Sequence, residues 1–294
     1  MEMKDYSNGL KPTWCPGCGD FSVLRSIQLA AAHLDLPREE MVVVTGIGCS
    51  GRLSGYMNTY GFHSVHGRSL PAAQGIKLAN RNLTVLAAGG DGDGFAIGTS
   101  HTVHAIRRNI DLTYVVMNNQ VYGLTKGHVS PLSQTGLKTK STPEGALDFP
   151  VQPGLLAISA GAGFYAQGFS AEQDELVDLI KAGIQHKGFS LIQVFSPCIT
   201  YNKTNTYNWF REHLISTEAA GHRDPTDFMA AVDILQQKCG LLTGLIYHNP
   251  KKPCFEETHD LMDQPPLTSL NIEPSEEQFQ QWTERYHMKR HMKR

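Results

Sequence analysis

Two short polar motifs in this sequence contain residues able to bind a metal ion and a phosphate group. The first is Gly90-Asp91-Gly92, and the second is the pair Asn118-Asn119. Carboxylate and amide oxygens suit Mg²⁺, whose remaining ligands are usually phosphate oxygens and water. Glycines let the backbone adopt positive φ angles and approach a phosphate closely. Together the two motifs predict a site for Mg²⁺ and a diphosphate.

Each motif follows an apolar run typical of a buried strand. Residues 83–88 precede the first motif, residues 112–117 precede the second, and residues 95–106 between them have the pattern of a helix. The pattern predicts a βαβ unit, whose right-handed crossover brings the carboxyl ends of both strands to one edge of the sheet. Asp91 and Asn119 could therefore converge on one ligand.

Cysteines form the second group of residues suited to chemistry. Cys15 and Cys18 lie in a Cys-x-x-Cys turn, which by itself fits a redox dithiol, half of a zinc knuckle or part of an iron–sulfur site. Cys49 and Cys198 each come just beyond a predicted strand, at residues 41–45 and 190–195 respectively. The sheet edge that gathers Asp91 could therefore also gather four thiolates, the usual complement of a 4Fe-4S cluster.

The other two cysteines are expected to lie outside this site. Cys239 closes a predicted helix at residues 227–237, where a cysteine is usually a small buried hydrophobe. Cys254 lies in a polar segment beyond the last clear strand.

Composition limits the classes of protein to which the chain can belong. Its 294 residues, 40% of them hydrophobic, are enough for one large α/β domain with a substantial core. A net charge of -2 indicates no broad basic surface for nucleic acid. No apolar run has the length of a membrane span, and the N-terminus is too polar for a signal peptide. We therefore expect a cytoplasmic protein that binds neither nucleic acid nor membranes.

The motifs together resemble one protein family. The Gly-Asp-Gly and Asn-Asn pair is similar to the thiamine diphosphate signature, and from about residue 10 to about residue 215 the chain resembles the β subunits of 2-oxoacid:ferredoxin oxidoreductases. The motifs that carry this resemblance are Trp14-Cys15-Pro16-Gly17-Cys18-Gly19, Gly46-Ile47-Gly48-Cys49-Ser50, His66-Gly67-Arg68, Gly90-Asp91-Gly92-Asp93 and Tyr122-Gly123-Leu124-Thr125-Lys126-Gly127.

The resemblance implies three cofactors, namely thiamine diphosphate, Mg²⁺ and one 4Fe-4S cluster. Asp91 and Asn119 would bind Mg²⁺ through their side chains and Val121 through its carbonyl oxygen, whereas Asp93 would contact the cofactor or only order the turn. The implied cluster ligands are Cys15, Cys18, Cys49 and Cys198. The other residues that the resemblance places at the cofactor are Ile47, Gly48, Cys49, Ser50, His66, Gly67, Gly90, Gly92, Gly123 and Leu124.

The resemblance also implies a reaction, in which a 2-oxoacid, coenzyme A and oxidised ferredoxin give acyl-CoA, CO₂ and reduced ferredoxin, reversibly. Residues 139–145 and 201–207 are most similar to the subgroup acting on 2-oxoglutarate, with pyruvate or another 2-oxoacid as the alternative. Arg52 and Lys126 are candidates to hold the distal carboxylate, and Leu124 to shape the substrate pocket, although both cations could instead be solvated loop charges.

A partner chain is implied as well. Thiamine enzymes need a carboxylate at the aminopyrimidine ring, and none of the motifs here marks one. In the family a separate α subunit supplies it, so we expect an α2β2 assembly and an inactive isolated chain. Two alternatives remain open at this point: a thiamine-dependent decarboxylase or synthase without electron transfer, and a zinc-stabilised binding module without catalysis.

The expected fold is an α/β thiamine diphosphate-binding fold, with a mostly parallel sheet flanked by helices. Its first 215 residues would hold the cofactors, with further helices at residues 153–162 and 171–186 and an active-site loop at residues 120–153. A C-terminal extension, residues 216–294, would pack on this domain or on the partner subunit. Its terminal repeat, residues 287–294, is interpreted as a solvated end or a cloning remnant.

Overall fold

The computed structural model describes residues 1–271 and 273–286 of the chain. The interpretation of the terminal repeat therefore concerns residues outside the described part. Among the described residues, no helix combines the length and the apolar character that crossing a membrane would require.

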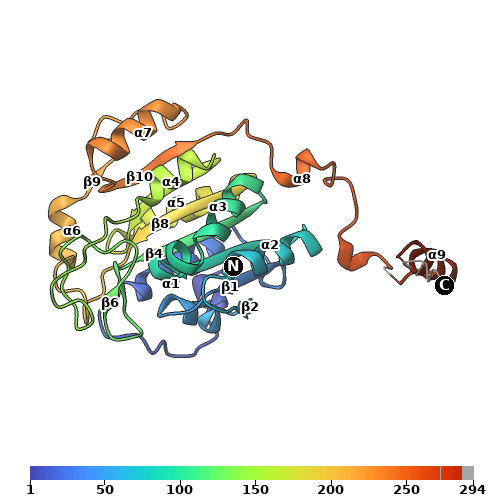
Figure 1. Cartoon of the computed structure of the whole chain (residues 1–294), viewed down its shortest axis with the longest axis horizontal. Helices are drawn as coiled ribbons and strands as arrows, with labels where there is room; N and C mark the ends of the chain where they lie inside the picture. Colours follow the sequence, from blue (N-terminus) through green and yellow to red (C-terminus); the bar gives the residue numbers. More distant parts are fainter. Residues whose placement is uncertain (272, 287–294) are drawn as a thin grey trace, which may run out of the picture.

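The centre of the molecule is a mostly parallel sheet, as expected (Figure 1). In the described chain its strand order is β2-β1-β3-β4-β8-β7-β10-β9, and β10 is antiparallel to its neighbour β7. The strands are β1 (Met41–Thr45), β2 (Tyr60–His63), β3 (Thr84–Gly90), β4 (Leu112–Asn118), β7 (Phe164–Phe169), β8 (Phe189–Phe195), β9 (Ile215–Ser216) and β10 (Leu242–His248). The α/β fold class is thereby confirmed.

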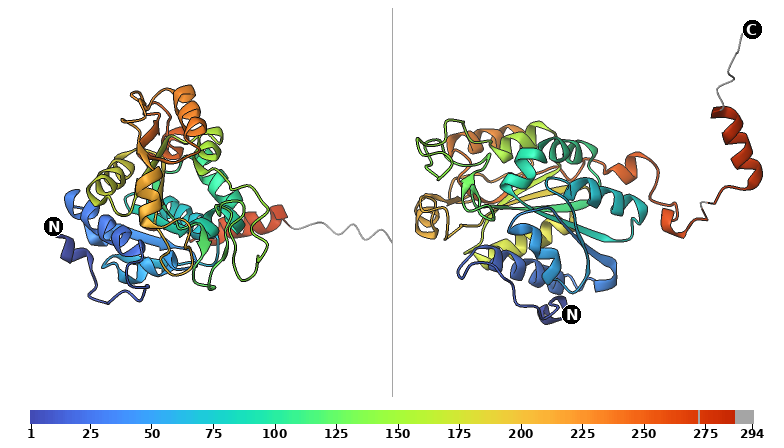
Figure 2. Two further views of the ribbon diagram at one scale, coloured as in Figure 1. Left: turned by 90° about the vertical axis from the view of Figure 1, so that its left-hand side faces the viewer. Right: turned by 60° about the horizontal axis from the view of Figure 1, so that its bottom comes forward.

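Helices cover both faces of the sheet (Figure 2). On one face lie α1 (Asp20–His33) and α5 (Gln173–Gln185), which pack on alternate strand residues such as Val43 and Leu86. The opposite face, with Val42 and Val85, is covered by α2 (Ser69–Ala79), α3 (Thr99–Arg108), α4 (Pro153–Ser159) and α7 (Phe228–Gln237). Because successive strand residues point to opposite faces, the continuous apolar runs of the inner strands are buried on both sides.

The predicted βαβ unit is present. The register of its strands determines where the two polar motifs lie along the sheet. β3 pairs with β4 in parallel, so that Gly90 lies opposite Met117. β4 pairs with β8 in the same way, so that Asn118 lies opposite Phe195. The motif residues that follow these strands therefore emerge at the same edge of the sheet.

The helix between β3 and β4 differs from its prediction. It begins with a π-helical turn, η4 (Asp93–Ile97), before α3 starts at Thr99. In this turn the Gly98 amide donates to the Asp93 carbonyl at 3.2 Å, five residues back. Turns of this type recur at functional sites because the extra residue changes the direction of the side chains.

The elements that were not predicted include α1, β2 and β7. All four residues of β2 are exposed, so it lacks the apolar run by which a strand is recognised. β7 is fully buried but contains Gln167 and Gly168, which interrupt its apolar pattern. The Gln167 side-chain amide is satisfied by the carbonyl oxygens of Gly240 and Leu242, at 2.7 and 3.1 Å. Such long-range pairing cannot be recognised from the local sequence.

The first part of the predicted C-terminal extension is continuous with the sheet. The helix expected at residues 227–237 is α7, whose N-terminus is capped by Asp227 through a 3.0 Å bond from the Ala230 amide. β10 then pairs with β7. The following segment, with α8 (Phe255–Thr258), η5 (Leu267–Ser269) and α9 (Glu276–Tyr286), leads away from the sheet (Figure 1). Arg81 contacts the stretch between α8 and η5 by donating to the carbonyl oxygens of Gln264 and Pro265.

The two remaining cysteines have environments opposite to those expected. Cys239 is exposed and occupies a left-handed turn, with φ of 50°, between α7 and β10. Cys254 is only 2% exposed, because the segment after β10 folds back so that the Phe255 amide donates to the Asn109 carbonyl. The prediction that Cys239 is a buried hydrophobe was therefore wrong, because the chain turns there instead of packing.

A pair of neighbouring histidines connects the turn after α5 to the end of β10, and His186 is the more buried of the two. His186, after α5, lies with its Nδ1 atom 3.2 Å from His248 Nε2 on β10. Burial, together with the neighbouring His248, lowers the pKa of His186 to about 4. The fold therefore favours the neutral imidazole.

This pair predicts a loss of stability in acid. The folded-state pKa of His186 lies below its unfolded value of about 6.5, so its contribution is complete above that pH and declines as pH falls towards 4. We expect His186→Asn to reduce the acid-induced loss in the free energy of unfolding by about 2 kcal/mol relative to the unmodified chain. Urea unfolding at several pH values would measure this. An identical pH dependence in both proteins would contradict the assignment.

Candidate functional site

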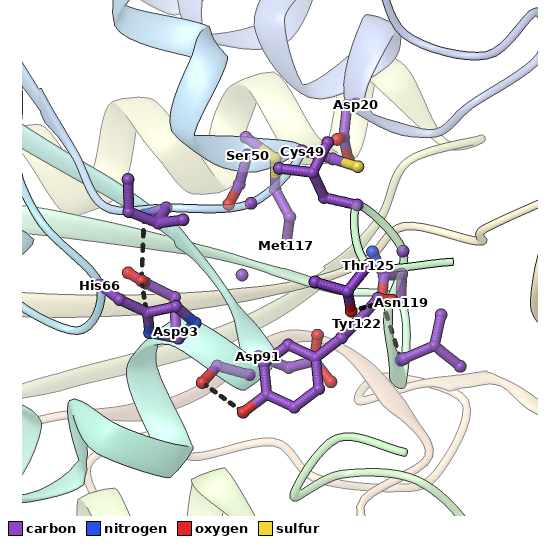
Figure 3. A pocket seen from close by; sticks show the side chains of 17 residues that line it. Asp20, Cys49, Ser50, His66, Asp91, Asp93, Met117, Asn119, Tyr122 and Thr125 are labelled. Carbon is purple, nitrogen blue, oxygen red and sulfur yellow. Dashed lines mark hydrogen bonds and ion pairs between the residues drawn. The ribbon is translucent and has the colours of Figure 1, made fainter. Parts of the chain in front are cut away.

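A pocket opens where β1, β3 and β4 end (Figure 3). Three short segments line it, namely residues 47–50 after β1, residues 90–93 after β3 and residues 119–125 around the turn after β4. Asp20, His66 and Met117 complete the lining. The predicted cofactor residues found together in this lining are Ile47, Gly48, Cys49, Ser50, His66, Gly90, Asp91, Gly92, Asp93, Asn119, Val121, Gly123 and Leu124.

Asp91 is a buried carboxylate with unusual surroundings. It is 1% exposed, and its Oδ2 atom accepts a hydrogen bond from the Ser130 hydroxyl. Burial raises the pKa of Asp91 to about 7, although the Ser130 hydroxyl and the neighbouring backbone amides favour the charged form. A carboxylate in such a place is greatly stabilised by a bound cation. Sequence reasoning missed Ser130, because it lies in the irregular segment after β4.

Asn119 is held in place by its own loop and by a second one. Its Oδ1 atom accepts from the Val121 amide at 3.0 Å, and its carbonyl oxygen accepts from Asn202 Nδ2 at 3.1 Å. Between Asn119 and Val121, Gln120 adopts a left-handed conformation, with φ of 60°. Non-glycine residues in this region of φ are uncommon and often occur at functional sites. Asn202 was not singled out from the sequence.

Asp93 joins three loops at the rim of the pocket. Its Oδ1 atom accepts from the Ile47 amide at 3.0 Å and from the Gly67 amide at 2.8 Å. His66 Nδ1 lies 3.3 Å from the same oxygen, while Asp93 Oδ2 is buried without a hydrogen-bond partner in the described chain. Gly67, although not part of the lining, thus reaches the site through its amide. Asp93 therefore ties the loops at Ile47 and Gly67 to the turn that follows β3.

Close contacts at two glycines shape the same pocket. A β-carbon at Gly92 would overlap the ring of Tyr122, whose hydroxyl donates to the Gly92 carbonyl at 3.1 Å. A β-carbon at Gly46 would overlap the Asp93 carboxylate. Both positions therefore require the absence of a side chain. Tyr122 belonged to a recognised motif, but its packing role became visible only in the structure.

The four predicted cluster cysteines are free thiols beside this pocket. A β-carbon built on Gly123 would lie 3.6 Å from the sulfurs of both Cys49 and Cys198. The buried Asp20 lies two residues after Cys18, and burial raises the pKa of both groups, that of Asp20 to about 6. A side chain at position 123 would thus contact two of the thiols.

The thiols are not arranged for a single metal ion. In residues 1–271 and 273–286, no three His, Cys, Asp or Glu side chains converge as the ligands of one ion would. A 4Fe-4S cluster has different requirements, because each of its four irons takes one thiolate and the sulfurs lie at separate corners. The absence of a single-ion ligand group in the described chain therefore does not bear on a four-iron cluster.

The three candidate substrate residues lie in different places relative to the pocket. Leu124 lines the pocket and is 50% exposed. Arg52 lies instead in a separate groove with Tyr56 and His63, and its Nη1 atom donates to the Thr13 hydroxyl at 2.5 Å. Lys126 is exposed in the turn after the pocket-lining residues, with φ of 72°. The structure therefore does not bring Arg52 and Lys126 into the pocket lining.

Comparisons with protein families agree with this geometry. Residues 32–194 match the family described as thiamine pyrophosphate enzyme, C-terminal TPP binding domain. Residues 198–264 match the family that describes the C-terminal part of the pyruvate ferredoxin oxidoreductase beta subunit. The first match contains the strand ends around the pocket, and the second begins at Cys198.

Individual proteins show the same similarity. Subunit beta of 2-oxoacid:ferredoxin oxidoreductase 1 from Aeropyrum pernix is 41% identical over 280 residues, which cover 92% of this chain and 87% of that protein. The 2-oxoglutarate oxidoreductase subunit KorB from Mycobacterium tuberculosis is 44% identical over 199 residues, which cover 68% and 53%. A solved structure of 2-oxoglutarate:ferredoxin oxidoreductase from Magnetococcus marinus, with 2-oxoglutarate, coenzyme A and succinyl-CoA bound, matches with a TM-score of 0.87, 34% identity and 96% coverage of both chains.

The bonds of Asp93 predict how this residue contributes to the fold. Asp93→Ala leaves two backbone amides without an acceptor, and we expect it to lower the free energy of unfolding by about 2 kcal/mol. Asp93→Asn keeps an oxygen that can accept from Ile47 and Gly67, so its loss should be less than half as large. Urea unfolding of both variants measures the difference. Equal losses would show that the acceptor oxygen is unimportant.

Proposed function

This chain belongs to the β subunits of the 2-oxoacid:ferredoxin oxidoreductases, and from that premise we propose that 2-oxoglutarate is its substrate. The proposed reaction converts 2-oxoglutarate, coenzyme A and oxidised ferredoxin to succinyl-CoA, CO₂ and reduced ferredoxin. One observation carries the electron-transfer part of this proposal. Cys49 lines the cofactor pocket and also lies with Cys198 beside Gly123, so the pocket and the thiols share a residue.

We propose that Asp91, Asn119 and Val121 hold Mg²⁺ in the thiamine diphosphate-binding domain. Asp91 is buried where a cation would stabilise its charge, and its Oδ2 atom accepts from the Ser130 hydroxyl. The single side-chain oxygen of Asn119 accepts one hydrogen bond, from the Val121 amide, and keeps its second lone pair for a cation. When bound, thiamine diphosphate supplies the electron sink that decarboxylation of a 2-oxoacid requires. The contribution of the chain is to position that cofactor, with Asp93 and Gly92 maintaining the shape of the pocket.

We propose that Cys15, Cys18, Cys49 and Cys198 hold a 4Fe-4S cluster. The surroundings of Gly123 support this, because a β-carbon there would contact the sulfurs of both Cys49 and Cys198. A one-electron carrier beside the decarboxylation site separates this enzyme from thiamine-dependent decarboxylases, which release the product without oxidising it. The four thiols are therefore the feature that favours the oxidoreductase over that alternative.

The choice of 2-oxoglutarate is supported by several relatives and by the solved structure, whose names specify it. Relatives of comparable identity carry the broader name 2-oxoacid:ferredoxin oxidoreductase. Leu124 and Thr125 line the pocket, and Lys126 follows them directly, so a small rearrangement of this turn would bring a cation towards a distal carboxylate. Arg52 remains the second candidate for that contact.

An α subunit is proposed to cover the pocket in an α2β2 assembly. Leu124 is 50% exposed at the pocket, and Ile97, whose side chain packs by Gly67, is 58% exposed. Large apolar side chains exposed around a polar pocket are typical of a surface that a partner protein buries. The carboxylate that thiamine chemistry needs at the aminopyrimidine ring would come from that partner.

The proposed function predicts a specific pattern of activity. Co-purified with its α subunit under anaerobic conditions, the chain should support CoA-dependent reduction of methyl viologen with 2-oxoglutarate, and the purified single chain should not. A panel of 2-oxoacids would measure the preference. Faster turnover with pyruvate than with 2-oxoglutarate would contradict the proposed substrate. Full activity of the single chain would contradict the need for the α subunit.

Gly123 provides a separate test of the cluster. Gly123→Val places a branched side chain between the Cys49 and Cys198 sulfurs, so we expect most of the bound iron and the EPR signal of the reduced sample to be lost. Gly55→Val is the matched control, because no atom lies within 4 Å of a β-carbon there. Iron analysis and thermal unfolding of both variants are the measurements. Full iron content in Gly123→Val would contradict the proposed position of the cluster.

A further inference from the structure

We propose that the electron carrier docks on the surface around the Cys15–Cys18 turn and that this carrier is a small acidic ferredoxin. The inference rests on the proposed function, because it requires a cluster held by the four thiols. This exit surface consists of Gly17, Ile199, Tyr201, Lys203, Tyr207 and Arg211.

The four thiols extend from the cofactor pocket to the outside of the chain. Cys49 lines the pocket, and Cys198 lies near it beside Gly123. Cys15 is exposed, whereas Cys18, Cys49 and Cys198 are partly covered. A group bound by all four would therefore accept electrons on the Cys49 side and be closest to solvent on the Cys15 side. Because electron transfer slows steeply with distance, a carrier protein must approach over the Cys15 turn.

Contacts from two later segments build the surface around this turn. The Tyr207 hydroxyl donates to the Gly17 carbonyl at 3.3 Å, which joins α6 (Tyr207–His213) to the cysteine turn. Ile199 Cδ1 lies 3.5 Å from a β-carbon built on Gly17. Tyr201 Cβ lies 3.0 Å from a β-carbon built on Gly127, in the turn that follows the pocket-lining residues. The exit surface is therefore close to the pocket but is formed by different residues.

Two cations lie beside the turn. Lys203 Nζ donates to the Ile199 carbonyl at 2.5 Å, and the Arg211 guanidinium lies 5.9 Å from the centre of the Tyr207 ring. Both residues are exposed, and within residues 1–271 and 273–286 neither forms a salt bridge. Glu212 is the one acidic residue between positions 199 and 215, so this stretch is positive overall.

The chemistry of the surface fits a negatively charged protein better than a small dye. Ile199 and Tyr201 are 36% and 39% exposed, and they provide apolar contact area next to the cations. Protein interfaces combine such apolar contacts with a charged rim. Opposite charges at the rim accelerate association and determine which partner is accepted. A ferredoxin with an acidic face has these properties.

The test is a double substitution, Lys203→Glu with Arg211→Glu, in the complete enzyme with its α subunit. A purified acidic 2[4Fe-4S] ferredoxin in the oxidised state is titrated calorimetrically at low and high salt. We expect the dissociation constant at low salt to rise about tenfold, and the difference to shrink at high salt because salt screens exposed charges. The KM for ferredoxin should rise in parallel, while the viologen-linked rate stays unchanged.

The matched control is Lys251→Glu. This exposed lysine follows β10, whose end pairs with the beginning of β7 and so lies at the opposite edge of the sheet. Unchanged ferredoxin affinity in the double variant, or an equal loss in Lys251→Glu, would overturn the inference.

Iron content and the EPR signal verify that each variant carries its cluster. If the double variant loses iron, the milder Lys203→Gln with Arg211→Gln replaces it. Absence of viologen-linked turnover in the unmodified enzyme would count against the proposed function instead, because the binding titration needs no turnover.

Discussion

The common level at which four parallel strands end is the constraint on which the rest of this structure depends. Thr45 pairs with Ala88, Gly90 with Met117, and Asn118 with Phe195, so β1, β3, β4 and β8 finish beside one another. A shift of one residue in any pair would turn alternate side chains to the other face of the sheet. Burial on both faces opposes such a shift. The register therefore fixes where polar residues emerge, and both groups of motifs emerge there.

Several carboxylates at this edge are buried, which would be unfavourable without the surrounding donors. Asp91 is bonded to Ser130, Asp20 to Ser196, and Asp93 to two backbone amides. These bonds offset part of the desolvation, yet one oxygen of Asp20 and one of Asp93 have no partner in the described chain. Buried polar atoms without partners are rare in folded proteins and concentrate at functional sites. The pocket therefore contains carboxylate oxygens that can bind a cation or accept a hydrogen bond from a ligand.

The elements with continuous apolar runs were predictable, and those defined by distant contacts were not. β1 was predicted with its observed bounds, and β4 within one residue, because both are buried and rich in valine. β2 is exposed along its whole length, and β7 depends on glutamine bonds to the turn before β10. The burial of Cys254 and the exposure of Cys239 likewise follow from how the chain returns after β10, which no local pattern contains.

The sequence by itself determined the family, the fold class and the residues able to bind cofactors. These residues could be found because their types and their positions after strands are local properties of the sequence. It also identified Cys49 and Asp91 as parts of two groups that meet at one sheet edge. Only the tertiary structure decided that Ser130, Tyr122 and Asn202 support the pocket, because these contacts join segments far apart in the chain. The tertiary structure also decided that Arg52 binds the Thr13 hydroxyl and lies outside the pocket lining. The local sequence does not specify this, because the position of a loop cation depends on which acceptor the fold brings near it.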